Sequence, residues 1–475
     1  MSQLQEAVWK EKILRWEQAV ASSKKLTLPE RIDLYRVRSI RPFLQSRWPQ
    51  FLVRSITLAG FIFTISAGLF GSRVGSHNFA IIFVWIAWWT ALKLVFIPLG
   101  GRSWCSVCPI PLPGEWLQGG GILVKGRRPL GLSLRWPKRL GGSWLQSGGF
   151  LLIGLFSAAI LTDARLTAWI LLALVGLAVA LSLVFEKRSF CRHLCPIGGF
   201  SGIYAKTAPV EVRVIDTAIC AGHREKTCYQ ACPWGLYPVA LRDTSQCGLC
   251  MECLRACPED NLALNLRAFA SDLGQNHRSR QLDEAFLALV MLGTALVFSA
   301  LFTGPWGSLK SAAYAIGSPA WLSYGLGFLA LNLIVMPAAF GLSVWGGNKF
   351  SGSKASLRNA IANQAQVLLP LGLFAWIAFT LSFALPKINT VQVVLSDPFG
   401  WGWNLLGAAG SPWFQDLSGF SLLLQTAALL VGLFWSASVA QRLARRDNRI
   451  DFRQALPVLA FCLAYSLLML WVMAG

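Results

Sequence analysis

The sequence predicts a mainly α-helical protein that crosses a membrane about nine times and carries a cysteine-rich insert between two groups of helices. Three observations support this fold class. Hydrophobic residues make up 55% and charged residues 14% of the 475-residue chain, whereas a soluble domain has about 25% charged residues. Apolar runs of roughly 20 residues, the length that crosses a bilayer, recur along the chain. Eleven of the twelve cysteines lie between Cys105 and Cys257, in short spacings followed by proline.

The predicted spans form two groups on either side of the insert. The nine apolar segments are residues 51–71, 79–99, 147–163, 167–185, 284–303, 320–345, 366–386, 418–438 and 455–474. The third of them is the shortest. The chain is therefore expected to consist of a basic amphipathic tail (1–49), a four-helix region (50–185), the insert (186–283) and a five-helix region (284–475).

The basic residues predict the orientation of the chain, whose net charge is +21. Lys and Arg gather in the tail, the insert and alternate loops, and cytoplasmic loops carry such an excess. We therefore expect a multi-pass membrane protein with the N-terminus and the insert in the cytoplasm. Because the Lys and Arg residues are grouped between the apolar runs in this way, we do not expect a nucleic-acid partner. Arg54 and Lys93 fall near cytoplasmic span ends, where we expect them to snorkel to the interface.

The insert carries the pattern C-x2-C-x2-C-x3-C-P from Cys247 to Pro258. This is the bacterial ferredoxin run, in which three thiolates bind one [4Fe–4S] cluster and the fourth binds its neighbour. A second run lies upstream and ends at Cys232, before Pro233. Crossed ligation assigns cluster one to Cys232, Cys247, Cys250 and Cys253. It assigns cluster two to Cys220, Cys228 and Cys257.

Cluster two lacks a fourth thiolate in this assignment. His223 follows Cys220 with two residues between them. Imidazole replaces thiolate on iron in Rieske centres, so His223 is a candidate fourth ligand. The alternatives are a three-iron cluster, or a water or another group on the fourth iron.

An internal repeat places four further cysteines at the ends of two spans. Arg102-Ser103-Trp104-Cys105 is echoed by Arg188-Ser189-Phe190-Cys191, and each copy continues to a Cys-Pro pair. The four cysteines are Cys105, Cys108, Cys191 and Cys195. Together they would form a tetrathiolate site for a third cluster or another soft metal. Two redox-active dithiols and paired structural cysteines are the alternatives. His193 is expected to form hydrogen bonds, and Cys462, alone within a span, to serve only in packing.

With the segments CPIGGF, ACPWGLYP and CGLCMECLRACPED, the chain resembles the NapH/NosR type of membrane polyferredoxin over about residues 50–270. The resemblance implies a protein of a prokaryotic inner membrane with a two-cluster ferredoxin-like domain facing the cytoplasm. It also implies respiratory electron transfer, often between the quinone pool and partner subunits. It implies cluster ligation by the cysteines of both runs in the insert. The C-x2-C spacing at Cys105 departs from the C-x3-C spacing of the family.

The leading hypothesis is a one-electron relay that works as a subunit of an oxidoreductase complex rather than as a stand-alone enzyme, with other redox subunits and a quinone as candidate partners. The alternative is a metal-reducing or cofactor-maturation protein that uses Cys105, Cys108, Cys191 and Cys195. A membrane scaffold with retained clusters is the third hypothesis.

Overall fold

The computed structural model describes residues 31–119, 130–222, 225–241, 243–273, 281–353, 355–408, 418–446 and 452–474. Among these residues, eight helical segments are long and apolar enough to span a membrane. They are Trp48–Phe70, Phe79–Gly100, Ala164–Val184, Leu282–Phe302, Pro319–Phe350, Leu357–Ser396, Ser418–Arg445 and Phe452–Ala474. Each overlaps a predicted span, so the polytopic, mainly α-helical fold class is confirmed. The two helices predicted near residues 4–20 and 27–30 lie outside the described residues.

Four of the long segments are single α-helices. They are α3 (Trp48–Phe70), α11 (Ala164–Val184), α16 (Leu282–Phe302) and α24 (Phe452–Ala474), and α23 (Ser421–Arg446) follows one short 3-10 turn. Asp163 caps α11 by accepting a hydrogen bond from the Leu166 amide at 3.0 Å, which satisfies a donor that the first helical turn leaves free.

The second span is wound differently from the others. It consists of α4 (Phe79–Ile81), α5 (Trp89–Ala91) and α6 (Ile97–Gly100), joined by two π-helical stretches, η3 (Ile82–Trp88) and η4 (Leu92–Phe96). Such π-helical turns are rare and frequently accompany functional sites.

The predicted third span, residues 147–163, is a broken pair of helices. α9 (Trp144–Leu155) ends at Phe156, where the backbone leaves helical geometry, and α10 (Ser157–Ile160) follows. The remaining helices are α2 (Ile40–Gln45), α7 (Trp104–Val107), α8 (Leu112–Gly119), α12 (Pro196–Ala205), α13 (Thr217–Gly222), α14 (Thr227–Ala231), α15 (Glu252–Ala256), α17 (Gly307–Tyr314), α18 (Pro319–Ala330), α19 (Met336–Phe350), α20 (Leu357–Gln364), α21 (Leu368–Ala384) and α22 (Ile388–Ser396).

The insert contributes two strands of a small antiparallel sheet. β2 (Val210–Val214) pairs with β3 (Leu262–Leu266), with Val212 opposite Leu264. The third strand, β1 (Ile32–Asp33), pairs with the other edge of β3. Tyr35, just beyond β1, packs in the same apolar cluster as Val212. Part of the predicted N-terminal tail therefore packs against the insert.

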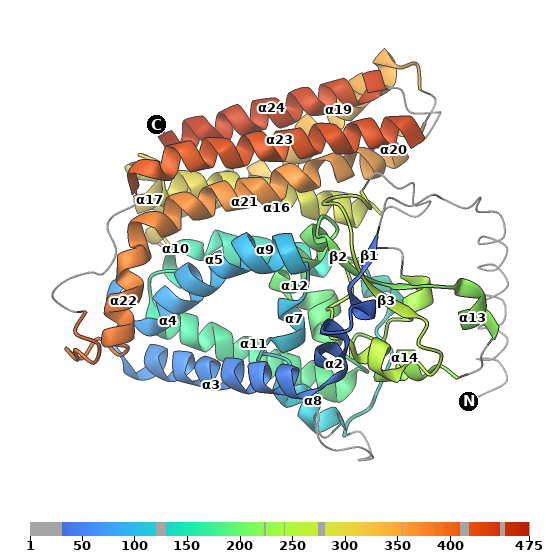
Figure 1. The fold of residues 1–475 in the computed structure, drawn as a ribbon. Helices are drawn as coiled ribbons and strands as arrows, with labels where there is room; N and C mark the ends of the chain where they lie inside the picture. The colour runs from blue at the N-terminus through green and yellow to red at the C-terminus, as the bar shows by residue number, and fades with distance from the viewer. Residues whose placement is uncertain are drawn as a thin grey trace.

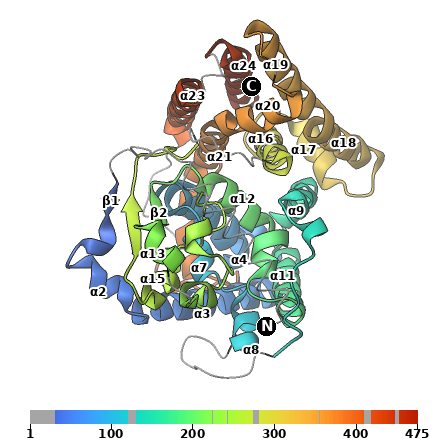
Figure 2. The same cartoon turned by 90° about the vertical axis from the view of Figure 1, so that its right-hand side faces the viewer.

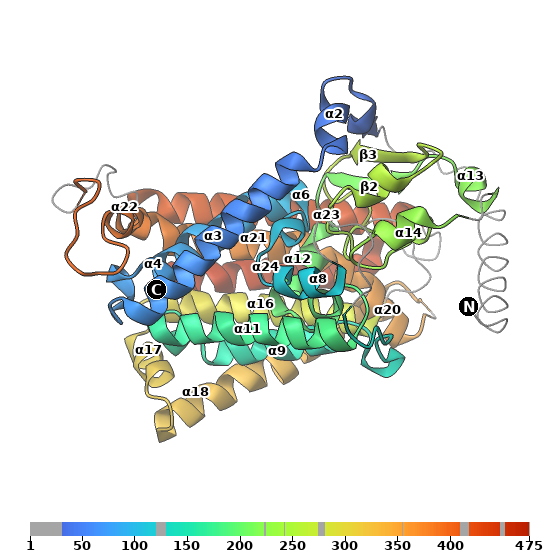
Figure 3. The same cartoon turned by 90° about the horizontal axis from the view of Figure 1, so that it is seen from below.

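The long helices lie side by side, and the insert lies at one end of them (Figure 1). The sheet, α13 and α14 gather at that end, while α22 lies at the opposite end, as the view from below also shows (Figure 3). Seen from the insert, α9 and α11 lie to one side of it and the helices of the C-terminal region lie above (Figure 2). The cysteine-rich segments thus lie where the insert meets the helix ends.

The apolar core joins the two helical regions. Trp376 on α21 is fully buried. Its ring packs edge-on against Phe150 of α9, Phe200 of α12 and Phe298 of α16, at centroid distances of 5.9, 5.4 and 5.5 Å. Aromatic pairs with this geometry stabilise a core beyond the area they bury. α12, which follows the second Cys-Pro motif, is therefore held between the two helical regions.

Candidate metal centres

The four cysteines predicted for cluster one converge in the structure. Cys232, Cys247, Cys250 and Cys253 line one small cavity. Cys253 lies close enough to the other three for their charges to act on it. We name these four cysteines set one.

The backbone around Cys250 is wound in an unusual way. The residues on either side of it, Leu249 and Met251, have φ angles of 51° and 61°. This left-handed region is costly for residues other than glycine, and such strain persists where the surrounding structure enforces it, often at functional sites. The amide of Leu236 also donates a hydrogen bond to Cys232 Sγ at 3.4 Å. Hydrogen bonds to ligand sulfurs are one means of tuning an iron–sulfur cluster.

Three thiols predicted for cluster two also come together, and we name Cys220, Cys228 and Cys257 set two. Cys228 interacts electrostatically with Cys257 and Cys220. Asn261 serves two of the three: its side-chain amide donates to Cys220 Sγ at 3.3 Å and its backbone amide to Cys257 Sγ at 3.4 Å. His223, the candidate fourth ligand, lies outside the described residues.

The four cysteines of the internal repeat form a third group, set three: Cys105, Cys108, Cys191 and Cys195. Cys191 interacts electrostatically with the other three. Cys105, Cys191 and Cys195 are buried, and Cys108 is partly exposed. The Gly198 amide donates to Cys195 Sγ at 3.3 Å. The repeat thus brings its two cysteine pairs together, whereas His193 stacks on the ring of Trp136 at 4.9 Å.

The two copies of the repeat are joined by reciprocal arginines. Arg102, from the first copy, donates to the carbonyl of Cys191 at 2.5 Å and to that of Ser245 at 3.0 Å. Arg188, from the second copy, donates to the carbonyl of Cys105. Both guanidinium groups belong to buried residues. Each copy therefore fixes the cysteine backbone of the other.

A buried ion cluster supports set three from the membrane side. Glu115 on α8 binds Arg188 and lies 3.9 Å from Arg54 of α3. Arg54 also donates to the carbonyl of Ser106 at 2.9 Å. The sequence interpretation of Arg54 as a snorkelling side chain is therefore wrong, because the residue is 9% exposed and binds the segment between two cysteines. The Arg54–Glu115 pair could not be recognised without the fold.

Lys93 also differs from its sequence interpretation. It was expected to snorkel to the interface, but it is fully buried, and Nζ has no hydrogen-bond partner among the described residues. The amine lies over three aromatic rings, those of Trp89, Trp376 and Phe379, at 5.0, 5.2 and 5.1 Å. Two of the rings come from α21, so this cage depends on packing between the two helical regions.

The three cysteine sets adjoin one another in a row. Cys228 of set two acts electrostatically on Cys253 of set one. At the other side, Cys232 and Cys250 of set one pack with Cys105 of set three around Trp234. The Trp234 ring also lies 4.3 Å from the Arg188 guanidinium. A Cβ on Gly248 would stand 2.2 Å from the ring, so only glycine fits there.

The described members of the three sets are all thiols, the ligand type that holds iron–sulfur clusters. No group of three or more His, Cys, Asp or Glu side chains in the part of the chain that the structure describes is arranged to hold a single metal ion. Burial raises the pKa of Cys195 and Cys247 to about 11 and that of Cys250 to about 12. Because metal binds the thiolate form, cluster binding at these thiols would be coupled to proton release.

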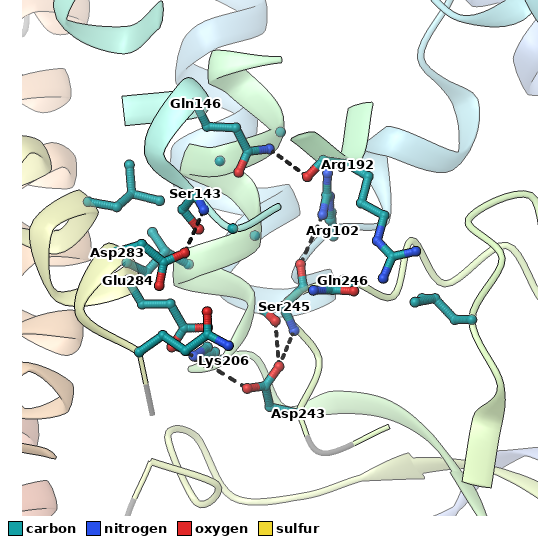
Figure 4. A pocket seen from close by; sticks show the side chains of 18 of the residues that line it. Arg102, Ser143, Gln146, Arg192, Lys206, Asp243, Ser245, Gln246, Asp283 and Glu284 are labelled. Carbon is teal, nitrogen blue, oxygen red and sulfur yellow. Dashed lines mark hydrogen bonds and ion pairs between the residues drawn. The ribbon is translucent and has the colours of Figure 1, made fainter. Parts of the chain in front are cut away.

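A polar cavity of about 600 Å³ lies beside sets one and three, between the insert and the ends of α9, α12 and α16. Figure 4 shows its walls, with Arg102 and Arg192 on one side and acidic residues of α16 on the other. Lys206 binds Glu284 at 2.6 Å and Asp243 at 3.3 Å. These bonds tie the insert to α12 and α16. Single-sequence reasoning did not find this junction, because its residues carry no motif.

Comparison with known proteins identifies an iron–sulfur family. Residues 81–132 and 167–213 match the family described as "4Fe-4S binding domain". These two stretches contain the two copies of the repeat. No solved structure matches the chain.

Among its curated relatives, the chain is 28% identical to the putative electron transport protein YccM of Escherichia coli over 26% of its own length. It is 28% identical to the methylamine utilization ferredoxin-type protein MauN of Methylorubrum extorquens over 30% of its length. It is 33% identical to the ferredoxin-type protein NapH of Haemophilus influenzae over 14% of its length. The chain spans 34%, 50% and 21% of these relatives, respectively.

Proposed function

Because the chain belongs to the NapH type of ferredoxin-like membrane proteins, we propose that it relays single electrons between a carrier on the cytoplasmic side and a quinone or redox partner at the membrane. The proposal assigns one [4Fe–4S] cluster to set one, a second to set two with a further ligand, and a third to set three. The helices of residues 284–475 would dock the partner subunits.

The observation that carries the proposal is the row of three cysteine sets. Set two lies toward the outer part of the insert, set one lies in the middle, and set three lies at the ends of the membrane helices. An electrostatic interaction between Cys228 and Cys253, and the packing of Cys105 and Cys250 in one cluster, link neighbouring sets. The match of a 4Fe-4S binding family to the two stretches around set three supports a cluster there.

Iron–sulfur clusters bound at these cysteines would supply one-electron chemistry. The chain's own residues prepare the sites. Amides of Gly198, Leu236 and Asn261 donate to ligand sulfurs. Arg102 and Arg188 place positive charge beside the thiolates and fix the carbonyls of Cys191 and Cys105. Burial excludes water from most of set three.

The same features weigh against metal delivery as the main function. A thiol that hands a metal ion to a partner has to be reached by that partner. Three of the four thiols in set three are buried, and Cys105 is packed against set one. This arrangement favours a resident cluster.

The test is anaerobic purification of the full chain, with iron quantification and EPR spectra of the dithionite-reduced protein. We expect Cys250→Ser, Cys228→Ser and Cys191→Ser each to lose about four irons, the content of one cubane, and a different part of the spectrum. Cys462→Ser is the matched control, because Cys462 is buried alone in α24, and it should keep all the iron. Reduced wild-type protein should be reoxidised by a soluble quinone analogue, and Cys191→Ser more slowly.

Two outcomes would contradict the proposal. Iron-free wild-type protein from anaerobic preparations would remove it entirely. Full iron retention in Cys191→Ser, together with stoichiometric copper binding by the wild type at set three, would replace the relay by a maturation role.

A further inference from the structure

Lys93 is an ionisable side chain inside a membrane span, and the proposed electron relay gives it no role. It lies on the π-helical stretch Leu92–Phe96 and is fully buried, and Nζ has no hydrogen-bond partner among the described residues. Three ring faces surround the amine. An ionisable group within a membrane span is costly, and such groups usually mark functional sites.

The cage alone does not settle the charge of Lys93. Aromatic faces attract a cation, but a buried ammonium without a counter-ion is strongly disfavoured. The elements packed against α21 carry the other ionisable side chains around the cage: Tyr204 on α12, Asp283 and Glu284 at the start of α16, Arg442 and Arg445 near the end of α23, and Arg453, Cys462 and Tyr465 on α24. Asp283 accepts from the Ser143 amide, and Glu284 binds Lys206. The cage therefore has no carboxylate of its own among the described residues.

The cage adjoins set three on the membrane side. The ring of Phe200 contacts those of Trp89 and Trp376, both part of the cage, at 5.3 and 5.4 Å. Phe200 lies five residues after Cys195, which is about 7.5 Å along a helix axis. By a second route, Trp88 contacts Trp104 at 5.5 Å, and Trp104 precedes Cys105. The negative charge of a four-thiolate cluster at set three would be the nearby counter-charge that the amine lacks.

We propose that Lys93 Nζ is a proton-binding site coupled to reduction at set three. The inference rests on the proposed function, since it requires a cluster there. When an external one-electron reductant such as dithionite delivers an electron, the negative charge at set three rises by one. The ammonium form of Lys93 becomes more favourable, and Nζ takes up one proton from the cytoplasmic solution. Reoxidation reverses both steps, so that one electron and one proton are gained or lost together.

Such coupling is reciprocal: if the electron favours the proton, the proton favours the electron to the same extent. The midpoint potential of the set-three cluster should therefore fall as pH rises through the range in which only the reduced state holds the proton. The limiting slope is a tenfold change in the reduced-to-oxidised ratio per pH unit, which is 59 mV for one electron.

The test is a redox titration followed by EPR at a series of pH values. The set-three signal is identified as the one that Cys191→Ser removes. Lys93→Met keeps the length of the side chain and removes the amine, so the cage stays filled. The matched control is Lys349→Met, because Lys349 also lies over a tryptophan ring, that of Trp345 at 4.1 Å, but is exposed.

We expect a pH-dependent potential in the wild type and in Lys349→Met. In Lys93→Met the potential should be lower at neutral pH and independent of pH over the same range. A wild-type potential that does not change with pH, or the same slope in Lys93→Met as in the wild type, would overturn the inference while leaving the relay intact. Absence of a set-three signal from iron-replete wild type would instead remove the third cluster of the proposed function.

Discussion

Glu115→Gln should destabilise the protein more than any surface charge change, because Glu115 is the shared partner of two buried cations. The side chains of Arg188 and Arg54 are 1% and 10% exposed, and Glu115 is 20% exposed. Glutamine keeps the shape of the side chain and removes its charge. Both guanidinium groups would then remain buried without a carboxylate.

The expected loss of unfolding free energy depends on the contacts that the two arginines keep. Breaking a buried ion pair by removing one partner costs about 3–5 kcal/mol. Arg188 retains the Cys105 carbonyl and the Trp234 ring, and Arg54 retains the Ser106 carbonyl. Glu115 is also partly solvated, so we expect the lower end of the range, about 3 kcal/mol. In the iron-loaded protein the loss should be smaller, because a bound cluster adds negative charge near Arg188.

The assay is equilibrium unfolding in mixed detergent micelles, with the iron-free and the iron-loaded protein. Glu115→Gln/Arg188→Met should recover part of the loss, since it removes one of the two orphaned charges. Asp260→Asn is the control: it breaks an exposed pair with Arg41, whose side chains are 44% and 50% exposed, and should cost about 0–1 kcal/mol. The reasoning is refuted if Glu115→Gln costs no more than this control, or if the double variant is no more stable than Glu115→Gln.

Two further predictions concern the contacts of the insert. Gly248→Ala should lose the iron of set one, because the new Cβ would collide with the Trp234 ring; Gly60→Ala, where a Cβ meets nothing within 4 Å, should keep its iron. The second prediction is a pH dependence. Burial raises the pKa of Asp243, but Lys206 and the hydrogen bonds from Ser245 together bring it well below its usual range. Burial lowers the pKa of Lys206, but Asp243 and Glu284 raise it above its usual range. Their contribution to stability is therefore complete at neutral pH and is lost as pH falls below the ordinary Asp range. Thermal midpoints between about pH 1 and pH 5 should show this loss in the wild type and a smaller loss in Lys206→Met.

The sequence was sufficient to predict the membrane helices and to group most of the cysteines. A span needs roughly 20 apolar residues in any fold, and eight of the nine predicted spans overlap helices of that kind. The third predicted span is not a single long helix, because the backbone breaks at Phe156. The local spacing of the ferredoxin run groups Cys247, Cys250 and Cys253 of set one, and Cys232 joins them from the upstream run. The assignment of cluster ligands stays a prediction, and that of His223 falls on an undescribed residue.

The sequence was insufficient where the partner of a charge comes from a distant segment. Arg54 and Lys93 occupy similar positions near span ends, which suggested the same interfacial role for both. Arg54 instead finds Glu115 and the Ser106 carbonyl, and Lys93 finds rings from α21. Neither partner has a periodic relation to its cation. Such contacts become visible only when helices that are remote in sequence are packed together.

The unequal cysteine spacings of the repeat have a structural explanation. Cys105 and Cys108 are separated by two residues and start in the α-helical turn α7, whereas Cys191 and Cys195 are separated by three. The second pair lies on a π-helical turn, residues 190–194, closed by a hydrogen bond from the Cys195 amide to the Phe190 carbonyl at 2.9 Å. A π turn holds one residue more than an α turn. The extra residue is thus absorbed by the winding of the helix, and both motifs still end beside a proline with their thiols in one group. The departure from equal spacing is therefore compatible with a shared site, which the reciprocal bonds of Arg102 and Arg188 hold together.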